Sequence, residues 1–293
     1  MKIKNCKLST YMLILGSHIS IAEGFPKAAL KTASHGANAM QIFTKNPRGR
    51  GAKPILKNDA EEFKKICKEK NIVFVVAHCS YLLNFAKPLS SSHWSIKDII
   101  SDLERINALG GKGVVLHIGK IKDHSYHDAL NELIKNLNAI LKKTVKLGNL
   151  IILENTAGQG SEMGHTIEQL AEVYAKMKKH KRIKFCFDTE HAFAAGYDWR
   201  DAGIREKTFK KFDTLIGLKN IVCFHFNDSL KEFGSRVDRH EDIGVGKIGL
   251  KALKEIAQFA EKRSIPLLLE TPETKHSHKE DIGQIKDWFQ KTI

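Results

Sequence analysis

The segment GVVLHIGKIKDHSYHDALNELIKNLNAILKKTVKLGNLIILE, residues 113–154, decides the fold class of this chain. It begins and ends with short apolar runs, 113–117 and 150–153, that are typical of buried strands. Between them, residues 128–147 carry apolar side chains three or four positions apart, which predicts an amphipathic helix ended by Gly148. A strand, a helix and a second strand in this order predict two parallel strands of one sheet, joined by a helical crossover.

The same alternation continues along the rest of the chain. A helix is expected at 61–70 with Asn58 and Asp59 as its N-terminal cap, and others at 250–263 and about 279–291. The expected strands lie at 13–17, 39–43, 72–77, 113–117, 150–153, 183–187, 221–226 and 265–269. Eight such units in 293 residues favour a (β/α)8 TIM barrel, a single domain over residues 12–293.

An open, doubly wound sheet is the alternative architecture. Such a sheet would usually carry a Gly-rich phosphate loop after its first strand, whereas Gly16-Ser17-His18 offers no GxGxxG motif. We therefore favour the closed barrel and expect no dinucleotide cofactor. Residues 1–11 are expected to form a flexible basic tail before the first strand.

The balance of charges points to the kind of partner. Lys and Arg number 48 against 33 Asp and Glu, which gives a net charge of +15. An excess of this size favours a polyanionic partner, either nucleic acid or a membrane surface, although a Lys-rich surface that only aids solubility would give the same number. No apolar stretch approaches the roughly 20 residues of a membrane span, so no membrane is expected among the partners.

The Cys residues indicate the compartment. The five of them, at positions 6, 67, 79, 186 and 223, are scattered and odd in number, which argues against a disulfide framework. The apolar run 11–16 is too short for a secretory signal, so we expect an intracellular, reducing location, either cytoplasm or nucleus. Cys79 and Cys186 are close in sequence to suspected ligands, so they either touch a metal or are inert buried thiols. No oligomer signal is present, and a monomer is expected.

Six consecutive expected strands end in a side chain that can bind a metal. In a (β/α)8 barrel the carboxyl ends of the strands form the active-site face. A single His after a strand is more often a hydrogen-bonded structural residue. Six imidazole and carboxylate side chains crowded at one barrel mouth, however, would destabilise the fold unless a cation compensated them. These residues are His78, His117, Glu154, Asp188, His225 and Glu270.

Three further candidates lie in the loops. His191 follows Asp188 closely, and Asp238 and His240 point the same way if their stretch is extended. Together with the strand ends they make nine candidates, more than the four protein ligands that one zinc ion uses. The set therefore predicts two or three metals with a bridging carboxylate. In a basic protein, clustered metals suggest a phosphodiesterase that acts on nucleic acid.

At these residues the chain resembles the endonuclease IV family of zinc-dependent abasic-site endonucleases. The resemblance extends from about Leu13 to the end and is carried by long runs in matching order. These are 43–48 (FTKNPR), 77–78 (AH), 153–160 (LENTAGQG), 187–198 (FDTEHAFAAGYD), 225–229 (HFNDS) and 234–240 (GSRVDRH).

The resemblance implies three zinc ions in a (β/α)8 barrel and a double-stranded DNA partner that contains abasic sites. It implies that His78 and His117 bind the first zinc, that Asp188, His225 and Glu270 bind the second, and that Glu154 bridges the two. It further implies that His191, Asp238 and His240 bind the third zinc. The implied catalytic residues are Glu154 and Glu270. The implied reaction is hydrolysis 5′ to the abasic sugar, which leaves a 3′-hydroxyl and a 5′-deoxyribose phosphate, together with trimming of blocked 3′ ends.

Three side chains sit where the family inserts residues into DNA. These are Arg48 after the second strand, and Tyr81 and Leu82 after His78. A planar or apolar side chain can fill the stack that an extruded nucleotide leaves. The alternative is an ordinary surface Arg and a packed Tyr-Leu pair.

The chain departs from the family pattern in two loops. Glu241 and Val245-Gly246 replace a second His and a Glu-Gly that follow the Asp-Arg-His run in related sequences, and Cys79-Ser80 replaces the commoner small residue and Pro. Two other functions stay open at this point. One is a sugar isomerase or epimerase of the xylose isomerase-like type, and the other is a noncatalytic DNA-binding protein with a stabilising metal site.

Overall fold

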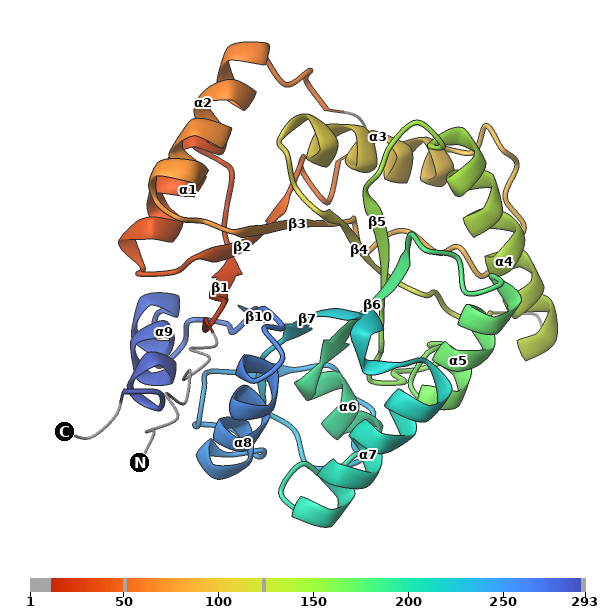
Figure 1. The fold of residues 1–293 in the computed structure, drawn as a ribbon. Coiled ribbons are helices and arrows are strands. Elements are labelled where there is room, and N and C mark those ends of the chain that lie inside the picture. The colour runs from red at the N-terminus through yellow and green to blue at the C-terminus, as the bar shows by residue number, and fades with distance from the viewer. Residues whose placement is uncertain (1–11, 50–51, 123–124, 291–293) are drawn as a thin grey trace, which may run out of the picture.

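The computed structural model describes residues 12–49, 52–122 and 125–290. The basic tail predicted at 1–11 lies outside the described residues. Within the described chain, eight parallel strands close into a barrel, and helices cover its outer surface (Figure 1). This closed barrel confirms the predicted (β/α)8 architecture and excludes the open sheet.

The strands of the barrel pair in the order β1-β10-β7-β6-β5-β4-β3-β2, and β2 closes onto β1. Register is continuous along several of these pairs, for example from Gly113 opposite Leu150 to His117 opposite Glu154. The strands are β1 (Leu15–His18), β2 (Ala39–Phe43), β3 (Phe74–His78), β4 (Gly113–His117), β5 (Leu150–Glu154), β6 (Ile183–Asp188), β7 (Ile221–His225) and β10 (Leu267–Leu269).

The helices lie outside the strands and pack on them through one apolar face each. Additional elements at the carboxyl end of the barrel are α6 and a two-stranded antiparallel hairpin of β8 (Asp228–Ser229) and β9 (His240–Glu241). The helices are α1 (Phe25–Ser34), α2 (Lys57–Glu69), α3 (Trp94–Ala108), α4 (Tyr126–Lys143), α5 (Ile167–Lys176), α6 (Thr189–Ala195), α7 (Ala202–Leu215), α8 (Leu250–Glu261), α9 (His278–Asp287) and the short 3-10 helix η1 (Leu218–Asn220).

The core has two layers. The larger one lies between the strands and the helices. The smaller one fills the inside of the barrel with Val76, Val115, Ile152, Leu268 and the thiols of Cys186 and Cys223. A filled barrel has no through-pore, so polar side chains have room only where the strands end.

Two predicted helix signals are wrong. Asn58 and Asp59 do not cap α2, because the helix already begins at Lys57 and Leu56 precedes it without a side-chain cap. Gly148 does not end α4, because the helix stops at Lys143. There, Arg182 from the next unit donates to the Thr144 carbonyl at 2.9 Å. The same carbonyl also accepts from the Leu147 backbone N at 2.9 Å, so a local turn and a distant side chain meet at this helix end.

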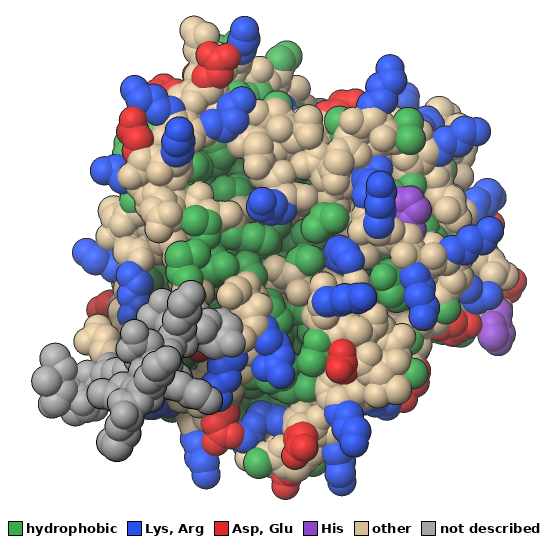
Figure 2. Space-filling model, in the orientation of Figure 1, with side chains coloured by type: hydrophobic (Ala, Val, Ile, Leu, Met, Phe, Trp, Pro, Cys, Tyr) green, Lys and Arg blue, Asp and Glu red, His purple; other side chains and the backbone are tan. Residues whose placement is uncertain are grey.

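Figure 2 shows one face of the molecule, on which apolar side chains gather at the centre and Lys and Arg side chains surround them. No His side chain is visible at that centre, so the candidate His ligands do not reach the surface there. Part of the positive charge of the chain therefore lies away from the mouth of the candidate site. No helix in the described ranges is long and apolar enough to cross a membrane.

Candidate metal centre

The six strand-end candidates converge at one end of the barrel, because all eight strands are parallel and finish there. His78, His117, Glu154, Asp188 and His225 are the last residues of β3 to β7, and Glu270 directly follows β10. They surround or underlie a cavity of about 940 Å³. Candidates that line the cavity wall are His78, His117, His191, Asp238, His240 and Glu270.

Glu154 lies at the centre of the cluster and is fully buried. Its Oε2 is 3.2 Å from Nε2 of both His78 and His117. Its Oε1 is 2.7 Å from Nδ1 of His225 and 3.4 Å from Nδ1 of His191. One carboxylate therefore faces imidazoles from opposite sides through its two oxygens, the arrangement that a bridging ligand between two cations requires.

His225 and Glu270 are held by Gln41 of β2. The Gln41 Nε2 donates to Glu270 Oε1 at 2.5 Å, and the Gln41 Oε1 lies 2.8 Å from His225 Nε2. Nδ1 of His225 then faces the carboxylates, 3.1 Å from Glu270 Oε2 and 3.8 Å from Asp188 Oδ2. Glu154, Asp188, His225 and Glu270 each offer a ligand atom within 4.8 Å of the others.

Two Asn side chains fix the carboxylates in place. Asn227 donates to Asp188 Oδ2 at 2.8 Å and accepts from the Glu270 backbone N at 2.8 Å. Asn155 accepts from the Asp188 backbone N at 2.7 Å. Asp188 also caps α6, since its Oδ1 accepts from the His191 backbone N at 2.8 Å. The same carboxylate thus starts the helix that places His191.

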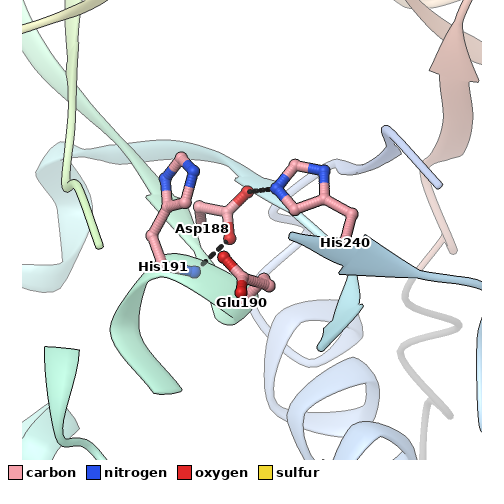
Figure 3. Close-up of side chains that lie close together, drawn as sticks. All are labelled: Asp188, Glu190, His191 and His240. Atoms are coloured by element: carbon pink, nitrogen blue, oxygen red, sulfur yellow. Dashed lines mark hydrogen bonds and ion pairs between the residues drawn. The ribbon is translucent and has the colours of Figure 1, made fainter. Parts of the chain in front are cut away.

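The loop candidates form a third set beside Asp188. Asp238 lies 3.3 Å from His191 Nε2 through one oxygen and 3.5 Å from His240 Nε2 through the other. His240 Nε2 also lies 3.7 Å from Asp188 Oδ2 (Figure 3). Glu190, which the sequence did not suggest, joins Asp188, His191 and His240 in one compact group of ligand atoms. All nine predicted residues therefore come together at the barrel mouth, and their roles as ligands stay a prediction.

Most of the imidazoles use one nitrogen on the protein and turn the other toward the carboxylates. Nδ1 lies near a backbone carbonyl oxygen in His78 (Cys79 O, 2.7 Å), His191 (Asn155 O, 2.9 Å) and His240 (Glu270 O, 3.2 Å). A carbonyl only accepts, so Nδ1 is assigned as the donor to the backbone in these three rings, and Nε2 is the nitrogen that faces the carboxylates. Metal-binding imidazoles are oriented in this way.

The electrostatics of the cluster show how strongly its groups interact. Burial alone would lower the pKa of His225, but the carboxylates of Glu154 and Glu270 outweigh it and raise the pKa to about 10. Burial opposes ionisation of Glu154, yet His225 and His117 hold its pKa well below the usual range. For Glu190 burial dominates and raises the pKa to about 7. His225 therefore carries a second ring proton that a divalent cation would replace.

The donor set fits metal ions. Imidazole nitrogens and carboxylate oxygens suit zinc, and groups of three or four of them meet within bonding reach of a shared ion. The buried His240 Nε2 and Glu190 Oε2 have no hydrogen-bond partner among the described residues. Buried polar atoms without a partner are uncommon, and a cation would satisfy both.

The described Cys residues are poor candidates for metal ligands. Cys67, Cys79, Cys186 and Cys223 are free and buried. Cys186 offers its sulfur near Glu154 and His225, but it points into the apolar interior of the barrel. Burial raises the pKa of both the Cys79 and the Cys186 thiol well above the usual value, which keeps them protonated. Inert buried thiols fit these observations better than metal ligands.

Arg48, Tyr81 and Leu82 are exposed, and Tyr81 lines the cavity together with Asn46 and Pro47, which directly precede Arg48. The Arg48 Nε donates to the Tyr81 hydroxyl at 2.8 Å. The loop before Arg48 is anchored by Lys45, whose buried Nζ lies 2.6 Å from Asp102 and 3.3 Å from Asp98 on α3. The Arg48 guanidinium is thus carried on a loop that a buried ion-pair network holds in place, and it is hydrogen-bonded to a ring from the loop after β3.

Sequence reasoning missed Gln41 and Glu190. A Gln in the middle of a strand carries no signal of its own, and its role follows only from the closed barrel that brings β2 near β7 and β10. Glu190 had a weak signal, because it is an acidic residue between the two suspected ligands Asp188 and His191.

Comparisons with known proteins agree with this geometry. A family model described as a xylose isomerase-like TIM barrel matches residues 29–292. The "Probable endonuclease 4" of Nitrosopumilus maritimus is 37% identical, with 88% of this chain and 93% of the relative covered. The protein of the same name from Chloroflexus aurantiacus is 38% identical, with 88% and 90% covered.

Solved structures give the same result. The crystal structure of endonuclease IV from Thermus thermophilus superposes with a TM-score of 0.83 at 28% identity, over 94% of this chain and 98% of that one. A D-tagatose 3-epimerase-like protein superposes with a TM-score of 0.67 at 18% identity, over 93% and 94% of the two chains. At that level of identity the epimerase likeness shows the fold alone.

Zinc binding to the metal-free protein at pH 7 should release protons. His225, with its pKa near 10, holds a proton at pH 7 that must leave before Nδ1 can bind a metal. Zinc affinity should rise with pH below about 10, and both this rise and the proton release from His225 should fade as the pH passes through about 10. Calorimetric titration in buffers of different ionisation enthalpy measures the number of protons. Zinc binding with no proton release at pH 7 would contradict this assignment.

Proposed function

This chain belongs to the endonuclease IV family, and we propose that it is a DNA-repair endonuclease that hydrolyses the backbone 5′ to abasic sites with a multi-zinc centre. The products would be a 3′-hydroxyl and a 5′-deoxyribose phosphate, and blocked 3′ ends would be trimmed by the same chemistry. The observation that carries the proposal is the set of His and carboxylate groups that share Glu154 and Asp188 at the bottom of one cavity.

The residues fit three zinc ions. His78 and His117 would hold the first, Asp188, His225 and Glu270 the second, and Glu154 would bridge them. The third would be held by His191, Asp238 and His240. When bound, adjacent zinc ions lower the pKa of water and stabilise the charge that develops on a phosphate. The compact first and second groups, which share Glu154, support this division.

The chain's own residues orient the reactive groups. Gln41 and Asn227 hold Glu270 from its side chain and its backbone, so that Oε2 stays beside His225. Glu154 keeps both of its oxygens between imidazoles of four different elements. We propose these two carboxylates as the catalytic pair, which position the attacking water while the surrounding barrel keeps bulk solvent away from it.

The substrate would enter over the rim that carries Arg48, Tyr81 and Leu82. These side chains would fill the space that an abasic nucleotide leaves when it swings out of the duplex. The net charge of +15 supports attraction to the phosphate backbone. We further propose that the protein is an intracellular monomer without a dinucleotide cofactor. The free thiols of Cys67, Cys79, Cys186 and Cys223 support a reducing compartment.

Nicking of a duplex with a single abasic site tests the proposal. The purified chain should cut that duplex and not its intact counterpart, and a chelator should abolish cutting until zinc is restored. Zinc content should be two to three ions per chain, because nine ligands exceed the need of one ion. A chain that epimerises ketoses and leaves abasic DNA intact would be a sugar enzyme, and one that binds DNA without cutting it would be a noncatalytic binder.

Glu270→Gln should lower the nicking rate by at least about 10²-fold while the fold is retained. Gln has the shape of Glu but lacks the charge that binds a cation and holds the attacking water. The measurement is single-turnover nicking at saturating zinc, with thermal unfolding as the check on the fold. A variant that nicks at nearly the wild-type rate would remove Glu270 from the catalytic pair.

Arg48→Ala should weaken binding to abasic duplex by about 1–3 kcal/mol and binding to intact duplex by little, if Arg48 fills the vacated stack. The measurement is a pair of affinities at one fixed salt concentration. Tyr81→Phe is the matched control, because it removes the Arg48 hydrogen bond and keeps the ring. Equal losses on both duplexes would reduce Arg48 to a phosphate contact, and no loss on either would leave an ordinary surface residue.

A further inference from the structure

Glu190 takes no part in the roles proposed above, although it lies against the third ligand set. It is a fully buried residue in the first turn of α6, between Asp188 and His191. Its Oε1 accepts from the Ser229 hydroxyl at 3.1 Å and from the Arg239 backbone N at 3.3 Å. Its Oε2 is buried and has no hydrogen-bond partner among the described residues. Burial of such an oxygen costs free energy unless something binds it.

A second buried atom of the third ligand set also lacks a hydrogen-bond partner among the described residues. His240 Nε2 is buried without a hydrogen bond, at 3.5 Å from Asp238 and 3.7 Å from Asp188. Since the His240 Nδ1 donates to the Glu270 carbonyl, Nε2 is the nitrogen left to bind an ion, and it offers an electron pair when the ring is neutral. An ionised carboxylate oxygen is likewise an electron-pair donor. Two such atoms cannot bond to each other, whereas one cation bonds to both.

The side chains that carry these two atoms belong to one compact group of possible ligands. Ligand atoms of Asp188, Glu190, His191 and His240 all lie within 4.8 Å of one another. In Figure 3 the carboxylate of Glu190 lies below that of Asp188, and the imidazoles of His191 and His240 stand on either side. Asp238 contacts the same two imidazoles.

We propose that Glu190 is a fourth protein ligand of the third zinc ion, beside His191, Asp238 and His240. The proposal rests on the proposed function, which assigns a third ion to this place. Two imidazoles and two carboxylates complete the tetrahedral shell of zinc and balance its charge. The third ion, held in this way, would join α6 to the β8–β9 hairpin.

A purely structural role for Glu190 is the competing explanation, because its Oε1 already joins α6 to the hairpin through Ser229 and Arg239. Glu190→Gln separates the two. Gln keeps a carbonyl oxygen that accepts both of these hydrogen bonds, and it replaces Oε2 with an amide nitrogen that does not bind zinc. Ser229→Ala is the matched control, since it removes one of the hydrogen bonds and leaves the carboxylate.

The experiment measures zinc stoichiometry and affinity of the full chain by elemental analysis and by competition with a chromophoric chelator. Glu190→Gln should weaken one zinc ion at least about tenfold and leave the other two unchanged. Asp238→Asn should weaken the same ion, and the double variant should lose that ion and no other. Ser229→Ala should keep all three. The unfolding temperature of the metal-free protein should be no lower for Glu190→Gln than for wild type, because the substitution removes a buried carboxylate oxygen that has no partner among the described residues.

Three zinc ions of unchanged affinity in folded Glu190→Gln would overturn the proposal, and so would a wild-type chain that binds only two ions. A crystal structure of the zinc-loaded wild type gives a test that does not depend on folding of the variant. Glu190 Oε2 is expected about 2.0–2.2 Å from zinc, and an Oε2 that touches no ion would overturn the proposal. These readouts do not use DNA. A Glu190-dependent zinc ion in a chain that fails to nick abasic duplex would reject the proposed function and leave this site standing.

Discussion

The structure of the barrel mouth depends on one constraint, the burial of the Glu154 carboxylate at the end of β5. A fully buried carboxylate needs positive charge or hydrogen-bond donors around it. Here both oxygens face imidazole nitrogens, and these come from β3, β4, β7 and α6. Four elements that reach the cavity are thereby bound to one point. The carboxylates of Asp188 and Glu270 add negative charge to that point, so cations complete the arrangement better than protons can.

The parallel barrel makes this convergence possible and also limits it. Parallel strands that close on themselves bring their last residues to one ring, which accounts for His78, His117, Glu154, Asp188 and His225 without any help from loops. The apolar filling of the barrel, with Val115 and Ile152 beneath the cluster, excludes polar groups from below. Ligands can then come only from the strand ends and from the loops above them. The first and second groups use the strand ends, and the third uses α6 and the β8–β9 hairpin.

The same difference between strand ends and the other parts of the chain decides which features of this protein its sequence predicts. Strand ends were predictable, because the alternation of apolar runs and helices leads to a barrel, and a barrel places its strand ends in contact. The end of α4 was not predictable, because the chain leaves the helix at Thr144, before Gly148, and the Thr144 carbonyl accepts both from the Leu147 backbone N and from the distant Arg182. The role of Gln41 was not predictable either, because its contacts with His225 and Glu270 connect β2 to strands far along the chain. Residues with a local pattern were found, and residues that act only through a distant partner were missed.

Asp188 shows why the two kinds of site cannot behave independently. One of its oxygens caps α6 through the His191 backbone N, and the other accepts from Asn227 and lies 3.8 Å from His225. A shift of α6 therefore moves the same carboxylate that completes the second group. Asn227 extends this coupling, since it also holds the backbone N of Glu270. The third group thus affects the second group through one hydrogen-bonded carboxylate, that of Asp188. A change in the stability of α6 or of the hairpin would therefore change the positions of the side chains at the centre of the barrel mouth.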